Sequence, residues 1–366
     1  MNNPSNIIQT LNLCKNYKNI KAINNLNLKI KKGEVFGLLG PNGAGKSTFI
    51  HILCTILKPS SGTAQINGYD IIKEPDKVRK SIGIVFQDPS IDDELTAYEN
   101  MEFHAMIYNV TAARDDILKL LRMVDLEVRA DDFVKTFSGG MRRRLEIARG
   151  LLHRPEILFL DEPTIGLDTQ TRRRIWEYLS GVVNENEITI ILTTHYLEEA
   201  DNVCDRIAII DEGKIKAIGT PGELKRNLNN YKIILKLIEK ENHILESESF
   251  MQDIITAITK KIKTKIDITN TNITKNNSEL KIEIVLKINN LQDDFDESLF
   301  ETLVIIRDTL KEFEGIFIKE IDLQKPTMDD VFIHHTGKNI RDELEHESHR
   351  RLRKVARRRN AGVVMR

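Results

Sequence analysis

The sequence predicts an α/β fold with a mixed sheet core and a helical insert, followed by a small α+β domain. Short, strongly apolar segments such as EILFLDEP and ITIILTTH alternate with segments of helical periodicity up to about residue 220. Strands that are apolar on both faces need helices on both sides, which indicates a largely parallel sheet. Three successive segments between Thr96 and Arg154 have helical spacing, and they form the predicted insert.

Composition points to a globular chain without a strong general charge. The chain has 366 residues, of which 40% are hydrophobic and 30% charged, and its formal net charge is −1. This balance favours two packed domains with a tail, and we expect no nucleic-acid partner. No run approaches the roughly 18 apolar residues that span a bilayer, and the first residues lack the apolar core of a signal peptide. We therefore expect a cytoplasmic chain that reaches a membrane only through a partner.

A domain boundary is expected near Pro221, where glycine becomes rare and Lys, Ile and Asn become more frequent. This gives a first domain over residues 1–220 and a second over 221–338. The second is predicted as strand, helix, strand, strand, helix, strand, which is the split βαβ, or ferredoxin-like, plan. The stretch TNTNITKNNS between its middle strands is interpreted as a loop. Residues 339–366 are predicted to form a charged, partly basic tail.

A glycine-rich loop follows the apolar segment GEVFGLLG and opens a helical segment. Its residues are Gly40, Pro41, Asn42, Gly43, Ala44, Gly45, Lys46 and Ser47. The pattern matches the P-loop G-x-x-x-x-G-K-[ST], in which backbone N–H groups and a helix N-terminus bind phosphate. Lys46 is expected to reach the β- and γ-phosphates and Ser47 to hold Mg²⁺. The plainer alternative is a glycine turn before a helix, here predicted over residues 46–57 with Ile56 on its apolar face.

Two acidic residues and one histidine follow apolar strands. Asp161 emerges at the end of the predicted strand Ile157–Leu160, where ligands of open α/β sheets bind. Its carboxylate can hold Mg²⁺, and Glu162 can orient and polarise an attacking water. His195 ends the segment ITIILTTH, which is expected at the same sheet edge. The alternative for the carboxylates is a strand that ends in an acidic turn.

A second helix start has an open backbone. Ser138 is a good N-cap for the arginine-rich helix that follows, and Gly139 and Gly140 leave the backbone accessible to a phosphate. The glycine-rich loop already provides one anion-binding helix start. The simplest explanation for a second one is that it binds the nucleotide of a second copy of the chain. The alternative is an ordinary cap with a Gly-Gly turn.

These elements occur in one order: GPNGAGKS, Gln87 after an apolar strand, SGGMRRRLEIARGLL, ILFLDEP, GLD and His195. In that order they resemble the ATP-binding domain of ABC transporters over about residues 5–220. Phe137 and Met141 stand where the family usually has leucine and glutamine. The resemblance implies a P-loop NTPase of the ABC cassette type, an ATPase that binds ATP and Mg²⁺ and works as a homodimer.

The resemblance also implies roles for the matching residues at the nucleotide. Tyr17 would stack on the adenine ring, whereas Lys46, Ser47 and Thr48 would bind phosphates and Mg²⁺. Gln87 would contact the γ-phosphate or the metal ion and report its presence to a membrane subunit.

Further matching residues would carry the chemistry and the dimer contact. Asp161 would serve Mg²⁺, Glu162 would be the catalytic base, and His195 would hold the γ-phosphate and the attacking water. The turn Ser138–Gly140 would contact the γ-phosphate bound by the opposite protomer, and Asp168 would lie at the dimer interface.

The segment KPTMDDVF resembles the end of the multidrug and daunorubicin-resistance type of export ATPase. That subgroup implies a separate transmembrane permease subunit and a place at the cytoplasmic face of the membrane. A soluble ABC ATPase of translation or DNA repair is the main alternative, but the chain has one cassette and no sustained heptads. A P-loop kinase or GTPase would not need the Ser-Gly-Gly helix.

Overall fold

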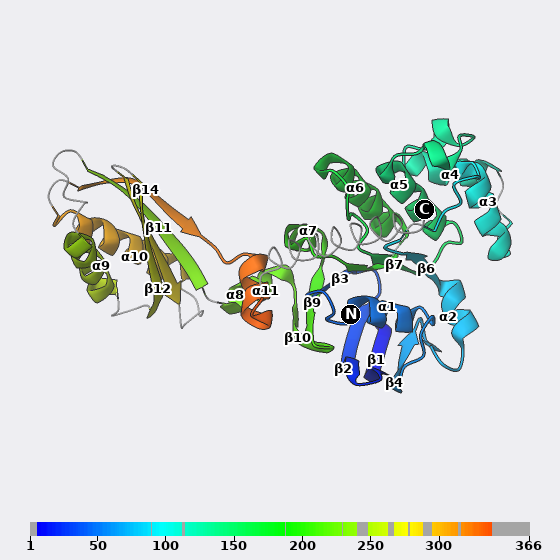
Figure 1. Ribbon diagram of the computed structural model, residues 1–366, viewed down its shortest axis with the longest axis horizontal. Coiled ribbons are helices and arrows are strands. Elements are labelled where there is room, and N and C mark those ends of the chain that lie inside the picture. Colours follow the sequence, from blue (N-terminus) through cyan, green and yellow to red (C-terminus); the bar gives the residue numbers. More distant parts are fainter. Residues whose placement is uncertain are drawn as a thin grey trace, which may run out of the picture. The chain divides into compact units, whose positions relative to one another are not determined.

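The computed structural model describes residues 6–88, 90–111, 114–186, 188–228, 230–239, 248–262, 267–276, 279–287, 295–313 and 316–338. Packing divides the chain into two compact units, Met1–Pro221 with Phe332–Arg366, and Gly222–Val331 (Figure 1). The first division lies one residue from the predicted boundary, whereas Phe332 and the described residues after it, up to Lys338, group with the first unit. The predicted tail lies outside the described residues.

A six-stranded sheet forms the centre of the first unit, in the order β10-β9-β3-β8-β7-β6. Its strands are β3 (Val35–Leu39), β6 (Ile82–Val85), β7 (Ile157–Asp161), β8 (Thr189–Thr193), β9 (Arg206–Asp211) and β10 (Lys214–Gly219). All pairs run parallel except β10 with β9. Every residue of β7 and β8 is buried, as expected for strands covered on both faces. The predicted mixed sheet core is therefore confirmed.

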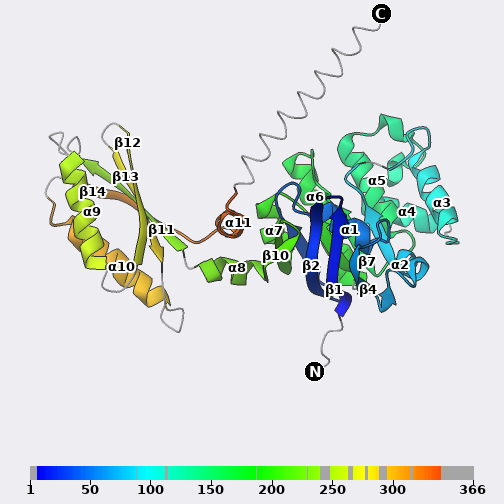
Figure 2. The ribbon, with the colours of Figure 1, turned by 60° about the horizontal axis from the view of Figure 1, so that its bottom comes forward.

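A second, antiparallel sheet in this unit has the order β2-β1-β4-β5. Its strands are β1 (Asn6–Tyr17), β2 (Ile20–Lys31), β4 (Ser61–Ile66) and β5 (Tyr69–Asp70). Helix α1 (Lys46–Leu53) packs between the two sheets (Figure 2). Phe49 of α1 and Phe159 of β7 are fully buried in the shared core, so the helix that follows the glycine-rich loop is held firmly against the central sheet.

Helix α1 is shorter than the sequence predicted. It ends at Leu53 instead of continuing to residue 57, and Ile56 is 51% exposed. Thr55 takes a left-handed backbone conformation with φ of +59°, which breaks the helical path before the turn residues KPSS are reached. The helical spacing of the apolar residues therefore predicted one more turn of helix than the structure has.

Helix α2 (Pro75–Ser81) contributes Val78 to the core that it shares with α1. Further helices form the predicted insert and cover the opposite face of the central sheet. They are α3 (Ala97–Ile107), α4 (Arg114–Met123), α5 (Gly139–Leu151), α6 (Thr169–Asn186) and α7 (Leu197–Val203), with 3-10 turns η1 (Glu127–Arg129) and η2 (Val134–Thr136). Figure 1 shows α6 and α7 on the side of the sheet opposite α1. The insert has its own core, in which Met101, Leu121 and Leu145 from three helices are fully buried. Thr96 and Glu99 form a capping box that starts α3.

The second unit contains a four-stranded antiparallel sheet in the order β12-β13-β11-β14. Its elements are β11 (Asn230–Glu239), α9 (Glu248–Ile262), β12 (Asp267–Asn276), β13 (Glu279–Lys287), α10 (Phe295–Leu310) and β14 (Ile316–Gln324). Helix α8 (Pro221–Leu228) precedes them, and helix α11 (Met328–Thr336) follows them and contains the division at Val331. Alternate residues Ile233, Leu235 and Leu237 of β11 pack against α9 and α10. The element order is the predicted one, and the ferredoxin-like assignment stays a prediction.

One predicted loop is a strand. The stretch TNTNITKNNS was expected to be a loop, but β12 covers Asp267–Asn276 and pairs with β13 along its length. Asn and Lys are poor strand formers by propensity, but the neighbouring strand supplies hydrogen-bond partners for their backbone groups. Tertiary pairing thus overrides local composition here.

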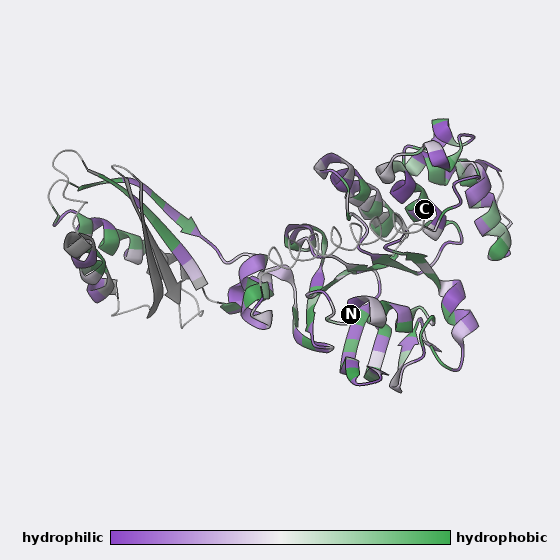
Figure 3. Ribbon diagram, in the orientation of Figure 1, coloured by the Kyte–Doolittle hydropathy of each residue, from purple (hydrophilic) through white to green (hydrophobic). Residues whose placement is uncertain are grey.

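Hydrophobic residues line the strands of the central sheet, whereas the outer helices alternate in character (Figure 3). Within the described residues, no helix is long and apolar enough to cross a membrane.

Gly83 sets the distance between β6 and α5. A Cβ at this position would lie 2.3 Å from the carbonyl oxygen of Gly150 and 3.0 Å from Cδ1 of Leu158. We expect Gly83→Ala to lower the free energy of unfolding by about 1–3 kcal/mol, because α5 must move away from the sheet. The measurement is urea or thermal denaturation of the full chain.

Gly181 of α6 provides the matched control, since a Cβ there meets no atom within 4 Å. Gly181→Ala should stabilise the chain by about 0.4–1 kcal/mol through the lower entropy of the unfolded state. Equal effects of the two substitutions would contradict the packing argument.

Candidate functional site

Parallel pairing brings the candidate residues to one edge of the central sheet. Thr193 at the end of β8 lies opposite both Asp161 of β7 and Leu38 of β3. Val85 at the end of β6 pairs with Leu160 in the same register. The glycine-rich loop, Gln87, the Asp161–Glu162 pair and His195 therefore follow the carboxyl ends of four strands at a common edge. The sequence predicted this shared edge for Asp161 and His195.

The glycine-rich loop between β3 and α1 depends on its glycines. Gly43 and Gly45 have φ of +81° and +106°, in the left-handed region that glycine adopts without strain. A Cβ on Gly45 would lie 2.3 Å from the carbonyl oxygen of Ala22, whereas Gly43 faces open space. The Lys46 ammonium is buried and donates to the carbonyl oxygens of Gly40 and Pro41, at 2.6 and 3.1 Å. The loop thus holds a cation beneath an open, glycine-lined surface, a geometry suited to phosphate.

Asp161 and Glu162 are held by the end of β8. Asp161 is buried, and the Thr193 hydroxyl donates to its Oδ1 at 2.5 Å. The Glu162 N–H contacts the same hydroxyl at 3.0 Å, and Glu162 has a left-handed φ of +49°. Its Oε2 lies 2.8 Å from Nδ1 of His195. An ionised carboxylate only accepts, so this contact places the proton on Nδ1 and leaves Nε2 for a further partner.

Ser138 caps α5 as predicted. Its hydroxyl accepts a hydrogen bond from the Met141 N–H at 3.3 Å, and Ser138 itself is exposed. A Cβ on Gly140 would lie 2.8 Å from Cγ2 of Thr171. Thr171 in turn donates to Asp168 through its N–H and its hydroxyl, at 2.9 and 2.7 Å. The structure therefore brings the Ser138 helix end and Asp168 together on one exposed surface.

The hydroxyl hydrogen bond from Thr171, helped by the Thr171 N–H, holds the pKa of the Asp168 carboxyl below its usual value. Asp168 is therefore charged at neutral pH and caps the start of α6 with a negative charge.

Gln87 and Tyr17 are exposed, and within the described residues no hydrogen bond or ring contact joins them to the other candidates. Gln87 lies two residues beyond β6, at the common edge. Tyr17 ends β1 in the antiparallel sheet, where the Lys15 ammonium lies 5.3 Å from its ring centroid. Ser47 and Thr48 are half-buried in the first turn of α1.

Sequence reasoning missed Glu199, a buried carboxylate of α7. It accepts from the hydroxyls of Thr164 and Thr194, at 2.7 and 2.8 Å, and from Nε1 of Trp176. Thr164 follows Glu162 by two residues and Thr194 precedes His195, so one carboxylate fixes the segments that carry both candidates. The sequence feature that could have identified it is a glutamate on the buried face of a short helix. A buried carboxylate needs several hydrogen-bond partners, so such a residue connects neighbouring segments.

The donor set at the sheet edge fits a nucleotide with a divalent cation. Lys46 and the open glycine backbone offer positive groups, and Asp161 with Ser47 offers oxygen ligands of the kind Mg²⁺ prefers.

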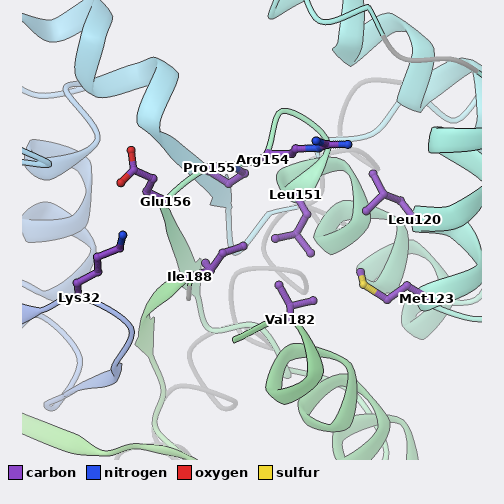
Figure 4. Close-up of a pocket in the computed structure, with 9 residues that line it drawn as sticks. All are labelled: Lys32, Leu120, Met123, Leu151, Arg154, Pro155, Glu156, Val182 and Ile188. Carbon is purple, nitrogen blue, oxygen red and sulfur yellow. The ribbon is translucent and has the colours of Figure 1, made fainter. Parts of the chain in front are cut away.

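A cleft of about 530 Å³ lies elsewhere in this unit (Figure 4). Lys32, Glu156 and Ile188, which line it, stand just before β3, β7 and β8, so it opens at the amino ends of these strands. Leu151 and Val182 form its apolar wall. It is at the other end of the strands from the candidate residues.

Comparisons with known proteins agree with this geometry. A family model described as ABC transporter matches residues 23–165. The daunorubicin/doxorubicin resistance ATP-binding protein DrrA of Streptomyces peucetius is 43% identical over 241 residues, which is 65% of this chain and 73% of that protein. The linearmycin resistance ATP-binding protein LnrL of Bacillus subtilis is 35% identical over 340 residues, 92% of this chain and 100% of that protein.

Solved structures show the same cassette. A dimeric, post-hydrolysis ATP-binding cassette bound to ADP and Pi superposes with a TM-score of 0.54 at 32% identity, over 58% of this chain and 98% of that one. These values show that the first unit has the cassette fold.

Glu199 provides a test of how the edge is held. In Glu199→Gln an amide N–H₂ replaces an oxygen that accepts hydrogen bonds, against an indole that can only donate. We expect a loss of about 1–3 kcal/mol in the free energy of unfolding, and a kcat for ATP hydrolysis lower by about tenfold or more.

Denaturation and steady-state kinetics of the full chain measure these effects. Glu198→Gln, an exposed neighbour on the same helix, serves as the control and should change neither quantity. An unchanged kcat in Glu199→Gln would exclude a role in placing the reactive groups.

Proposed function

Because this chain belongs to the ABC transporter family as its ATP-binding and ATP-hydrolysing subunit, we propose that it powers export through a separate membrane permease. The proposed substrate is a drug-like or lipophilic compound, since both relatives named above are resistance proteins by name. The observation that carries the chemistry is the Glu162–His195 contact at the sheet edge that also holds the Lys46 loop.

In the proposed site, the loop Gly40–Ser47 cradles the phosphates of ATP with its N–H groups, and Lys46 turns from its loop carbonyls to the β- and γ-phosphates. Thr48 adds a donor in the first turn of α1, and Tyr17 stacks on the adenine. Ser47, Gln87 and Asp161 are the proposed Mg²⁺ ligands. When bound, the cation neutralises charge that develops on the phosphate oxygens.

Glu162 is the proposed general base for the attacking water. Its backbone is held at Thr193 and its carboxylate at His195, so its orientation is set before ATP arrives. His195 keeps a proton on Nδ1 through this contact, and Nε2 is proposed to face the γ-phosphate and the attacking water. Nε2 accepts from the water when the ring is neutral, and it donates to a phosphate oxygen only when the ring carries a second proton. The Glu162 carboxylate and the His195 ring are thus proposed to face the same side of the nucleotide.

The Ser138–Gly140 helix end is proposed to bind the γ-phosphate held by a second copy of the chain. Ser138 and Gly139 are exposed, and the helix N-terminus offers free N–H groups with a partial positive charge. Asp168, joined to Gly140 through Thr171, would lie at the same interface. Closure around two ATP molecules and reopening after hydrolysis then form a two-state switch, biased by contacts to the γ-phosphate.

Helix α3 is the proposed docking surface for the permease. Phe103, Met106 and Ile107 are 59%, 65% and 59% exposed, and their spacing places them on one side of the helix. A cluster of large apolar side chains on a surface helix is typical of a protein interface. Docking there would place this chain at the cytoplasmic face of the membrane, with Gln87 close to the permease.

The two-site proposal predicts an ATP-trapped dimer. Glu162→Gln keeps the shape of the side chain but cannot accept the proton, so kcat should fall by about 10²-fold or more while ATP still binds. Size-exclusion chromatography with millimolar ATP should then show a dimer. Lys46→Ala should hydrolyse no ATP and should stay monomeric, because it lacks the phosphate contact.

Gly139 supplies a matched control for the interface. A Cβ on Gly139 meets no atom of its own chain within 4 Å, so Gly139→Trp should fold normally. In the Glu162→Gln background it should prevent dimer formation by filling the space of the partner's γ-phosphate. A dimer that survives this change would contradict the proposed sandwich.

The docking proposal predicts that apolar contacts on α3 hold the chain to the membrane. Phe103→Glu with Met106→Glu should reduce the fraction of the chain that sediments with membranes containing the permease, by about tenfold or more. ATPase activity of the purified chain should stay unchanged. Val128→Glu, at a site that is 91% exposed in the same insert, is the control. Normal sedimentation of the α3 variant would exclude this surface.

A further inference from the structure

One arginine of α5 hydrogen-bonds to three backbone carbonyls in two segments that carry candidate residues. The Arg143 side chain is only 8% exposed. Its Nη2 donates to the carbonyl oxygen of Asp161 at 3.0 Å and its Nε to that of Pro163 at 2.7 Å. Its Nη1 donates to the carbonyl oxygen of Phe86 at 2.5 Å. The first two carbonyls bracket Glu162, and the third immediately precedes Gln87.

The same helix also holds the far side of the Gln87 loop. Glu146, buried one turn after Arg143, accepts from Arg143 Nη1 at 2.9 Å and from the Ser90 N–H at 2.8 Å. Arg149, a further turn along, donates to the Ser90 carbonyl oxygen at 2.6 Å. The Gln87 loop is therefore attached to α5 both before and after the glutamine.

Guanidinium geometry makes this arrangement specific to arginine. Its N–H groups lie in one plane and point in fixed, divergent directions, so a single side chain can serve three acceptors from two segments. A lysine ammonium is a point charge on a flexible stem and cannot span them in the same way. A whole buried ion pair can often be replaced by apolar side chains at little cost, whereas removal of Arg143 alone would leave the buried Glu146 without its cation. Here its loss removes a donor from three backbone carbonyls, two of them in buried hydrogen bonds and one in a part-buried bond.

We propose that Arg143 is a positioning residue, which holds the Glu162 and Gln87 backbones in one arrangement and ties both to the helix that begins at Ser138. The proposal rests on the roles proposed above for Glu162 and Gln87. Arg143 itself touches no substrate. Its effect is to make movement of the Ser138 helix end and movement of the two nucleotide-facing residues a single event, because the three segments share one side chain.

Sequence and packing explain why this residue is where it is. Arg143, Ile147 and Gly150 recur at helical spacing on α5, and a Cβ on Gly150 would lie 3.4 Å from Cγ2 of Val85. This side of α5 therefore packs on β6, next to the loop that begins at Phe86. An arginine on the buried face of a helix is unusual unless its donors are all used.

Steady-state kinetics of the full chain with MgATP test the proposal. Arg143→Lys keeps the charge beside Glu146 but loses the divergent donors, and Arg143→Met loses both. We expect kcat to fall by about 10²-fold in each variant, as for a misplacement of about 1 Å, while KM changes by no more than about twofold. Arg144→Lys is the matched control, because Arg144 donates to Val124 within the helical insert, and it should retain kcat.

A double-substitution cycle separates positioning from a general loss of stability. If Arg143 acts by placing Gln87, the effects of Arg143→Lys and Gln87→Ala on kcat should not add, and the double variant should be no slower than the slower single one. Fully additive effects would overturn the placement of Gln87 by Arg143. So would an Arg143→Lys variant with a lower melting temperature but unchanged kcat.

Glu162→Gln, measured in the same assay, distinguishes a failure of the proposed catalytic base from a failure of the positioning role. If Glu162→Gln hydrolyses ATP normally, the proposed base is wrong. If Glu162→Gln is inactive and Arg143→Lys is fully active, only the positioning role is wrong.

Discussion

Register between parallel strands is the constraint on which the rest of the site depends. β3, β8, β7 and β6 pair side by side, and their carboxyl ends stop at one edge of the sheet. Backbone hydrogen bonds therefore fix the positions of loops that are far apart in the sequence. The buried core around Phe49 and Phe159 holds α1 against the same strands, so the first turn of that helix meets the edge at a fixed height. A slip in the register of these strands would move all of these groups apart at once.

Two buried charged side chains hold the segment around Glu162 in place. Glu199 accepts from Thr164, and Arg143 donates to the carbonyls of Asp161 and Pro163. Buried charges destabilise a fold unless their hydrogen-bonding groups are satisfied, and here each serves at least three partners. Satisfied networks move as units instead of loosening gradually. In the two-state switch proposed above, such connections would pass a change at the nucleotide to the helices that carry Arg143 and Glu199.

Much of this arrangement could be predicted from the sequence. The glycine-rich loop, the apolar strands before Asp161 and His195, and the Ser138 cap are local patterns with a clear physical meaning, and the mixed core of the fold follows from their order. The end of α1 and the strand at Asp267–Asn276 could not be predicted, because Thr55 and the pairing with β13 depend on tertiary context. Glu199 and Arg143 were missed for the same reason: their partners are backbone and hydroxyl groups from distant segments, which no spacing rule identifies.

The left-handed backbone of Glu162 has a consequence for how this protein can evolve. A non-glycine residue in that conformation costs roughly 1 kcal/mol or more, which the surrounding hydrogen bonds must offset. Glycine or asparagine at this position would relax the chain and abolish the carboxylate. With Glu162 as the proposed base, greater stability and retained turnover would favour different residues at this one position. The acidic side chain would then persist only while hydrolysis itself is under selection.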